Sequence, residues 1–376
     1  MKMNFKLFRM LLEILLLTAS FCNAQRSNKC NPGSQCKPLS SCPQMLDILN
    51  SGIDSNLQIV RNNICYSVRS KTGVCCPTPL TSSATKAPEI TIGHPAESVS
   101  LLPAKCGLPA TEVKIINGSP ALIGAFPWMA ALGYTAPGRS KPSFLCAGSV
   151  INSKYVLTAA HCLDPNEIGG HTLSVIHLGD YDLTTDKDCE RKSLGLKCFP
   201  PHIVAGVEDT VLHPKYNTRA KSSDDVALIR LNLTVDFDSS SATIQPVCLP
   251  PKGFNFRAFA GNRTPIAAGW GLTEHGNRSN ILLRVNVPIA NDTLCKERYK
   301  GKFVGNQLCI GGTEEGFDTC RGDSGGPLFM TNQYGPPFYQ VGIVSFGPLP
   351  CGVYRSPGVY ANVFDYRDWI INNLRP

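Results

Sequence analysis

The sequence predicts an all-β protein with a small disulfide-rich module on its N-terminal side, and three observations carry that prediction. From residue 106 onward, short runs rich in β-branched and apolar residues alternate with Gly, Pro, Asn and Asp, which is typical of an all-β barrel or sandwich. Six cysteines crowd into residues 30–76, a density typical of a small scaffold held by disulfides. Residues 77–105 are rich in Ser, Thr, Pro and Ala, which indicates a flexible linker.

The strands of the large domain are expected where the apolar runs occur. The clearest runs are residues 126–132, 155–159, 226–231, 266–268 and 341–345. The C-terminal end differs, because its apolar residues Phe364, Trp369, Ile370 and Leu374 fit one face of a closing helix. With 376 residues, 43% of them hydrophobic, the chain has ample material for a core.

The cysteines and the N-terminus indicate secretion. Seventeen cysteines are too many for a cytosolic protein of this size. Residues 1–24 combine a basic start, an apolar run at 10–20 and the small-residue sequence Cys22-Asn23-Ala24, which predicts a signal peptide. Its removal would take Cys22 away and leave an even number of cysteines, suited to full pairing. We therefore expect a secreted, extracellular protein.

Charge and hydropathy argue against two classes of partner. The formal net charge is +8, but no run of five Lys or Arg occurs, so nucleic acid is a poor candidate. The apolar run of the signal is too short to span a bilayer, and no later stretch approaches the length that a membrane-spanning helix needs. We expect neither nucleic acid nor membrane as a partner.

Three short motifs carry the groups of a nucleophilic hydrolase. Gly322-Asp323-Ser324-Gly325-Gly326-Pro327 puts a serine in a tight turn, where the N–H groups of Gly322 and Ser324 can converge on an oxyanion. Thr158-Ala159-Ala160-His161-Cys162 offers a base, and Asp225-Val226-Ala227-Leu228 offers a carboxylate. A glycine–serine turn alone is more often a surface loop, but the order His, Asp, Ser is that of a known triad.

Together, TAAHC, DVAL and GDSGGP resemble the chymotrypsin/trypsin family of serine proteases over residues 115–376. The resemblance implies two six-stranded β-barrels with a C-terminal helix, and hydrolysis by acyl transfer without a cofactor. It makes Ser324 the nucleophile, His161 the general base and acid, and Asp225 the group that orients His161. The neighbouring Asp224 is expected to be a solvated turn residue.

The same resemblance implies trypsin-like specificity. Asp318, six residues before Ser324, matches the floor of the pocket for the residue that precedes the cut. A buried carboxylate there needs the cation of a substrate Arg or Lys. Gly347 and Gly358 match the pocket walls, where a side chain would block a long substrate residue, and Ser345 matches the segment that pairs with substrate.

Lys114-Ile115-Ile116-Asn117-Gly118 resembles the family's activation site. Cutting after Lys114 would free the Ile115 ammonium, which would pair with Asp323 and so complete the oxyanion hole. The chain as written is then a zymogen. The Lys at the cut implies an upstream activating protease of trypsin-like specificity.

The N-terminal cysteines, ending in Cys75-Cys76 and followed by a linker, resemble the arthropod clip-domain serine proteases. The implied division is a signal peptide at 1–24, a clip domain at 28–77, a linker and activation segment at 78–114 and a protease domain at 115–376. The implied disulfides are Cys30–Cys75, Cys36–Cys65, Cys42–Cys76, Cys106–Cys248, Cys146–Cys162, Cys295–Cys309 and Cys320–Cys351. Cys189 and Cys198 remain, and we expect them to pair within an inserted loop.

The inserted loop resembles that of members that activate prophenoloxidase or process the Toll ligand. We therefore expect a protease that cleaves a protein zymogen or precursor in an extracellular cascade of haemolymph, with a serpin-type inhibitor. One alternative is a venom protease acting on host haemostasis or melanisation. Another is a non-catalytic binding protein of the cascade. The clip domain is either a docking module for a partner or an inert spacer.

Two further groups of residues complete the set of candidates. Sequons begin at Asn232, Asn262, Asn277 and Asn291 and predict glycans. Asp180 opens a loop, Gly179-Asp180-Tyr181-Asp182, in which some relatives bind calcium; the alternative is a solvated acidic loop. The remaining histidines, expected to be surface or satisfied polar residues without metal-ligand spacing, are His94, His171, His177, His202, His213 and His275.

Overall fold

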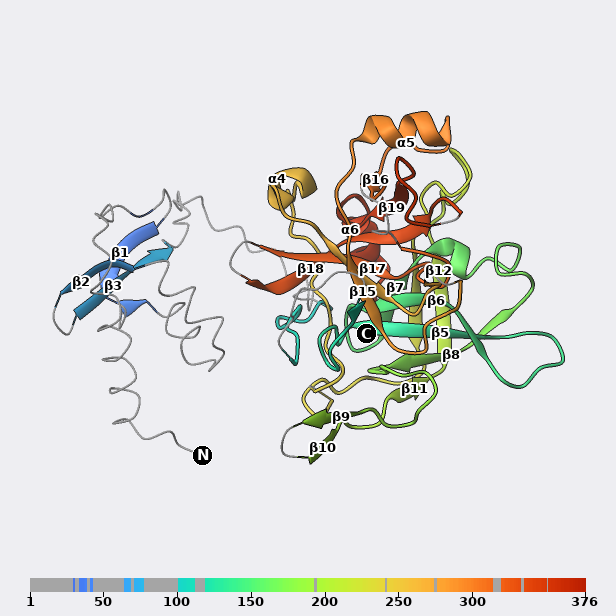
Figure 1. Ribbon diagram of the computed structural model, residues 1–376, viewed down its shortest axis with the longest axis horizontal. Coiled ribbons are helices and arrows are strands. Elements are labelled where there is room, and N and C mark those ends of the chain that lie inside the picture. Colours follow the sequence, from blue (N-terminus) through green and yellow to red (C-terminus); the bar gives the residue numbers. More distant parts are fainter. Residues whose placement is uncertain are drawn as a thin grey trace, which may run out of the picture. The chain divides into compact units, whose positions relative to one another are not determined.

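The structure, a computed structural model, describes residues 30, 34–38, 41–42, 64–68, 71–77, 101–111, 119–192, 195–240, 242–273, 276–313, 319–332, 335–349 and 351–376. They belong to two compact units, Met1–His94 and Pro95–Pro376 (Figure 1). The expected signal peptide, most of the linker, and the residues Lys114, Ile115, Asp318, His94 and His275 lie outside the described residues.

The smaller unit contains a three-stranded antiparallel sheet of order β1-β3-β2. Its strands are β1 (Ser34–Pro38), β2 (Ile64–Val68) and β3 (Lys71–Pro77). Three disulfides join this unit: Cys30–Cys75, Cys36–Cys65 and Cys42–Cys76. Val74 is the buried apolar side chain here apart from the cysteines, among the residues described. The three disulfides therefore contribute to the cohesion of this small unit.

The first barrel of the larger unit has the strand order β11-β8-β5-β6-β7-β13-β12. Its strands are β5 (Met129–Thr135), β6 (Ser143–Val150), β7 (Tyr155–Thr158), β8 (Thr172–Leu178), β11 (Ile203–Ala205), β12 (Val207–Leu212) and β13 (Ala227–Leu231). Only Gly206 separates β11, which pairs with β8, from β12, which pairs with β13. This one bent segment therefore closes the sheet into a six-stranded barrel.

The second barrel has the order β16-β19-β18-β17-β14-β15-β4. Its strands are β14 (Ile266–Gly269), β15 (Leu283–Asn286), β16 (Gln307–Ile310), β17 (Pro327–Asn332), β18 (Gly335–Phe346) and β19 (Gly358–Asn362), with β4 (Ser119–Pro120) added beside β15. A bridge between Ile289, just after β15, and Ile310 of β16 closes the ring. The predicted fold class of two six-stranded barrels is confirmed.

Aromatic side chains fill the core between the two barrels. The Trp128 ring meets the Phe329 ring edge-on with centroids 5.2 Å apart, and Phe126 lies 4.8 Å from Phe329. Phe329 belongs to β17, whereas Phe126 and Trp128 precede β5. Residues 126–128 form a turn around Pro127, so the strand that the sequence places at 126–132 begins at Met129, because Pro has no N–H to offer a sheet.

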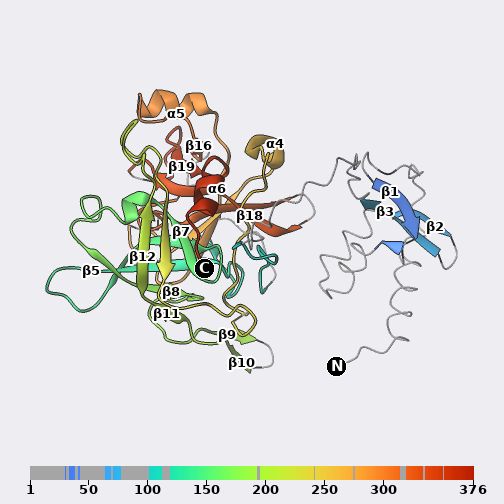
Figure 2. The same cartoon turned by 180° about the vertical axis from the view of Figure 1, so that it is seen from behind.

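Helices are few: α4 (Phe256–Ala260), α5 (Asp292–Tyr299), α6 (Val363–Asn372) and the short turn η3 (Ala160–Cys162). The expected closing helix is α6, but its buried face is Val363, Tyr366 and Ile370, while Leu374 lies beyond its end. Figure 2 shows the C-terminus beside α6 and near β7, where the Arg375 N–H donates to the Tyr155 hydroxyl. No helix in the described ranges is long and apolar enough to cross a membrane.

Candidate active site

His161 sits in η3, directly after β7, and its backbone is held on two sides. Cys162 forms a disulfide with Cys146 of β6, and its carbonyl accepts a 2.9 Å hydrogen bond from the Tyr134 hydroxyl. Thr158, the last residue of β7, donates to the Ala147 carbonyl at 2.8 Å. The imidazole therefore projects from a rigid turn, and 17% of its side chain remains exposed.

Asp225 precedes β13 and fixes the imidazole. Its carboxylate, 1% exposed, accepts the His161 backbone N–H at 2.9 Å and the Nδ1–H of the same residue at 2.8 Å. The Ser345 hydroxyl donates to the same Oδ2 atom at 2.5 Å. This arrangement sets the tautomer of His161 and leaves Nε2 available as a base.

Burial and charge act in opposite directions on this pair. Burial alone would raise the pKa of Asp225, but the charge of His161 and the hydrogen bonds from His161 and Ser345 hold that pKa below its ordinary value. Burial would lower the pKa of His161, but Asp225 and its hydrogen bond raise it above the ordinary value. The carboxylate therefore stays ionised and stabilises a proton taken up by the imidazole.

Ser324 lies in the turn that joins Cys320 to β17. Its carbonyl accepts the Ala147 N–H at 2.8 Å, and the Gly325 N–H donates to the Val344 carbonyl at 2.9 Å. A Cβ on Gly325 would lie 2.2 Å from the Thr158 Oγ1 and 3.0 Å from the Cys162 Sγ. The turn thus packs on the segment that carries His161, and glycine is required for that approach.

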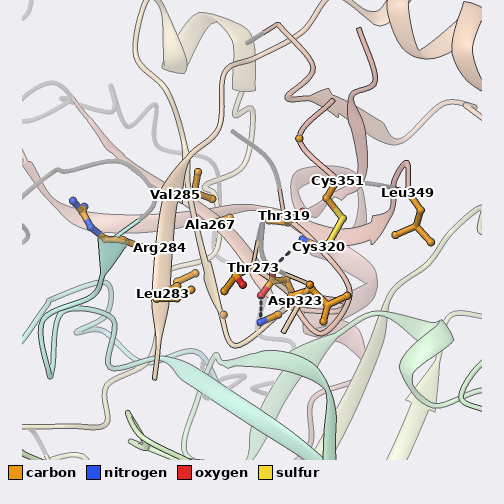
Figure 3. Close-up of a pocket in the computed structure, with 16 residues that line it drawn as sticks. Ala267, Thr273, Leu283, Arg284, Val285, Thr319, Cys320, Asp323, Leu349 and Cys351 are labelled. Carbon is orange, nitrogen blue, oxygen red and sulfur yellow. Dashed lines mark hydrogen bonds between the residues drawn. A yellow bond between two sulfur atoms is a disulfide. The ribbon is translucent and has the colours of Figure 1, made fainter. Parts of the chain in front are cut away.

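Asp323 stands beside a pocket of about 360 Å³. Its carboxylate accepts the backbone N–H groups of Gly271 and Cys320, each at 2.9 Å (Figure 3). Burial raises its pKa, opposed by those two hydrogen bonds and by the charge of Arg278. Within the described ranges, no cation forms an ion pair with it. Glycine is needed at 269 and 271, where a Cβ would lie 2.1 and 2.5 Å from the Asp323 oxygens; no motif in the sequence indicates this requirement.

The positions expected to contact substrate meet where β18 ends and β19 begins. Phe346 of β18 pairs with Val359 of β19, and a Cβ on Gly347 would lie 3.7 Å from the Gly358 Cα. The two glycine backbones therefore face each other, and the Cys320–Cys351 disulfide lies in the neighbouring segments. Asp318 lies outside the described residues, so its place at this pocket stays a prediction.

The expectation for Asp224 is wrong. Its side chain is 3% exposed, and both carboxylate oxygens accept from the Arg219 guanidinium at 2.9 Å. The Tyr366 hydroxyl of α6 lies 3.3 Å from Oδ1. Asp224 is therefore a buried partner of an arginine. Arg219 is only five residues away, but the contact with Tyr366, 142 residues away, cannot be read from the local sequence.

The loop around Asp180 combines buried acids with two imidazoles. The Asp180 Oδ2 atom lies 2.8 Å from the His177 Nδ1 and 3.7 Å from the His202 Nδ1. Asp188 accepts the backbone N–H groups of Tyr181 and Asp182 at 3.0 and 3.1 Å. Calcium takes oxygen ligands, so the two nitrogens nearest Asp180 do not fit it. The expectation that these histidines are surface or satisfied residues is wrong for His202, whose Nδ1 is buried and has no hydrogen-bond partner among the residues described.

The remaining disulfides of the larger unit are Cys106–Cys248, Cys189–Cys198 and Cys295–Cys309. Cys189 begins β9 (Cys189–Lys192) and Cys198 ends β10 (Gly195–Cys198), so their disulfide closes the open end of this hairpin. The asparagines of the four sequons, Asn232, Asn262, Asn277 and Asn291, are exposed. Glycans on them stay a prediction.

Comparison with known proteins finds serine proteases throughout. Residues 115–370 match the family described as Trypsin. The Spaetzle-processing enzyme of Drosophila melanogaster is 33% identical, with 94% of this chain and 92% of that protein aligned. The phenoloxidase-activating enzyme of Bombyx mori is also 33% identical, over 94% and 82% of the two chains. The crystal structure of the Drosophila Grass clip serine protease of the Toll pathway covers 90% of this chain and 93% of its own, with a TM-score of 0.61 and 32% identity.

Proposed function

The chain belongs to the trypsin family of serine proteases, and we propose that it is a secreted zymogen that, once cut after Lys114, cleaves protein precursors after Arg or Lys in an extracellular immune cascade. It is a trypsin-like serine endopeptidase similar to clip-domain proteases over most of its length. The observation that carries the proposed mechanism is the Asp225 carboxylate, which holds His161 through two hydrogen bonds and Ser345 through a third.

In this mechanism His161 takes the proton of the Ser324 hydroxyl as Ser324 attacks the substrate carbonyl. Asp225 stabilises the imidazolium, and the N–H groups of Gly322 and Ser324 receive the oxyanion. The imidazolium then protonates the leaving amine, and water hydrolyses the acyl-enzyme by the same steps in reverse order. This chemistry needs no cofactor.

Asp323 supports the proposed activation. It is a carboxylate whose pKa is raised by burial, beside a pocket and without an ion pair among the residues described. A cation delivered there would be strongly stabilised, because an unpaired buried charge is costly. The new ammonium of Ile115 is such a cation. Its pairing with Asp323 would hold the Gly322–Ser324 turn in place.

The cascade is proposed from the names of the relatives. One processes Spaetzle, one activates phenoloxidase, and one acts in the Toll pathway. These names favour a cascade in haemolymph over the venom alternative. A serpin-type inhibitor and a docking partner for the clip domain belong to the same proposal. Calcium at Asp180 stays a prediction, although the imidazoles around that residue do not suit calcium. No step of the proposed catalytic mechanism depends on calcium.

The test uses the full-length zymogen before and after a limited cut by a Lys-specific protease. The new N-terminus is sequenced, and amide substrates with Arg, Lys or Phe before the cut are assayed. Activity on Arg and Lys that arises only with an Ile115 terminus is expected, and the Ser324→Ala protein controls for the added protease. Correct cleavage without activity would contradict the proposal. An Asp318→Ser variant that still cleaves after Arg and Lys would overturn the specificity.

A further inference from the structure

His177, Asp180 and His202 form a cluster that the protease mechanism does not use. His177 lies on β8, Asp180 follows β8 by two residues, and His202 precedes β11. The register of these two strands sets Val204 opposite His177, which brings the two imidazoles together. Their rings are stacked, with centroids 4.4 Å apart and an angle of 21° between the planes.

The cluster is buried and incompletely paired. The Asp180 side chain is fully buried, and those of His177 and His202 are 16% and 9% exposed. Within the part of the chain that the structure describes, the His202 Nδ1 and the Asp180 Oδ1 have no hydrogen-bond partner. Burying a polar atom without a partner is costly. Two such atoms in one cluster therefore indicate that a further group satisfies them.

We propose that His177, Asp180 and His202 bind a zinc-class divalent transition metal ion. One ligand atom from each residue lies within 4.8 Å of the others. In a tetrahedral zinc site with bonds near 2.0–2.1 Å, ligand atoms stand about 3.3 Å apart. The two distances from Asp180 Oδ2, 2.8 Å to His177 and 3.7 Å to His202, bracket that value. Imidazole lone pairs lie in the ring planes, so the two stacked rings must turn out of their present arrangement before both nitrogens point at one ion.

The donor set selects the kind of metal. Two imidazole nitrogens and one carboxylate oxygen suit zinc and its neighbours, whereas calcium requires oxygen ligands. Three protein ligands leave a fourth position for water. The carboxylate of Asp188 is already committed to backbone N–H groups and to the Thr185 hydroxyl, so it supports the loop beside the ion.

The site is linked to the pocket beside Asp323. Tyr181, next to Asp180, accepts the Leu282 N–H at 2.9 Å and the Trp270 Nε1–H at 3.0 Å through its carbonyl. Trp270 and Leu282 stand next to residues that line that pocket, which include 267–269, 271–273 and 283–285. A metal ion on Asp180 would therefore stabilise the loop that supports the pocket wall.

The test measures the melting temperature of EDTA-treated full-length Ser324→Ala protein with added ZnCl₂ or CaCl₂. At zinc about 100-fold above the dissociation constant, a rise of roughly 5 to 10 °C is expected, with a smaller effect of calcium. In His202→Phe, which keeps a stacked ring and removes the nitrogen, the zinc shift should vanish. Co²⁺ added in place of zinc should give visible absorption bands in the parent protein and none in the variant.

The control is His171→Phe, another partly buried histidine, whose Nδ1 lies 2.9 Å from the Ile168 carbonyl; it should keep the zinc shift, as should His161→Ala. If His202→Phe fails to fold, His177→Phe replaces it. A parent protein that zinc does not stabilise would overturn the proposal. So would a zinc shift that survives in His202→Phe, or a calcium shift that replaces it.

Discussion

The side chains around Asp225 work as a unit because three donors meet on one buried carboxylate. Two come from His161 and one from Ser345, so the imidazole cannot rotate without breaking a charge-assisted hydrogen bond. The low pKa of Asp225 adds stability to the folded protein above its unfolded pKa of about 3.9, and that stability is lost as the pH falls through the folded value. The raised pKa of His161 acts oppositely, and its contribution is lost as the pH rises through that value.

Asp225→Asn should therefore lower activity and move the pH profile. An amide in place of the carboxylate holds the wrong tautomer of His161, and kcat/KM on an Arg amide should fall about 10⁴-fold. In the activated parent enzyme the acidic limb of kcat/KM should lie above pH 6.5, because the pKa of His161 is raised. The limb should move to lower pH in the variant, because the charge that favours the imidazolium is gone.

Ser345→Ala is the matched variant, since it removes one donor to the same oxygen and keeps the His161–Asp225 pair. Its loss should stay below about 100-fold, the value of one hydrogen bond to a charged group. An Asp225→Asn enzyme with an unmoved acidic limb would contradict the assignment of that limb to His161.

The sequence can reveal the role of a residue that lies in a short motif, but not a role that depends on contacts with residues far away in the chain. The roles predicted for His161, Asp225 and Ser324 depend on short motifs, and the structure brings the His161 and Asp225 side chains together. The hydrogen bond from Ser345 to Asp225 and the burial of Asp224 depend on residues 120 and 142 positions away. The proximity of His202 to His177 and Asp180 depends on strand register, which no local spacing of histidines reveals.

Among the elements, the segment from the end of β14 to Gly271 can pack closely against the Asp323 carboxylate because it contains two glycines. Gly269 ends β14, and Gly271 follows Trp270; neither position has room for a Cβ beside the Asp323 carboxylate. The all-β class was predictable from the apolar runs and turn residues, and the two six-stranded barrels from the family resemblance, whereas this fit was not predictable. A glycine required by a close approach looks in the sequence like any glycine of a loop.

Gly271→Ala should destabilise the protein and impair activation. Its Cβ would lie 2.5 Å from the Asp323 Oδ2, so the carboxylate or the loop must move, at a cost of about 1 to 3 kcal/mol. Urea unfolding measures that loss, and the amidase activity of the cut protein should fall with it. Gly305→Ala is the control, because its Cβ would meet only the Arg219 Nη1 at 3.7 Å. Equal effects of the two substitutions would contradict this account.

At the scale of the whole molecule, activation changes the environment of one buried charge. In the intact protein the raised pKa of Asp323 means that stability falls as the pH rises above 3.8, its ordinary value. An Ile115 ammonium beside it would lower that pKa and reverse the sign of the contribution. The melting temperature of cut Ser324→Ala protein minus that of intact protein should therefore grow between about pH 4 and pH 7. A difference independent of pH would contradict the pairing.

The Cys106–Cys248 disulfide decides what happens to the N-terminal part after that cut. It joins residues on opposite sides of Lys114, with a sequence separation of 142, so cleavage of the backbone leaves both parts covalently linked. The Gly107 N–H also donates to the Pro246 carbonyl at 2.7 Å, and the Phe338 N–H to the Gly107 carbonyl at 2.8 Å. The segment around Cys106 is therefore part of the folded protease unit.

Cut protein should accordingly run as one band on a non-reducing gel and as two bands after reduction. The Cys106→Ser/Cys248→Ser double variant should give two bands in both lanes, whereas Cys295→Ser/Cys309→Ser, which removes a disulfide within the protease domain, should still give one without reductant. A single band from the Cys106→Ser/Cys248→Ser protein under non-reducing conditions would show that another disulfide joins the two parts. In the parent protein, the disulfide would keep the clip domain attached to the active enzyme. A partner bound by the clip domain would then face the active site at an effective concentration of about the millimolar range, as is typical of short tethers.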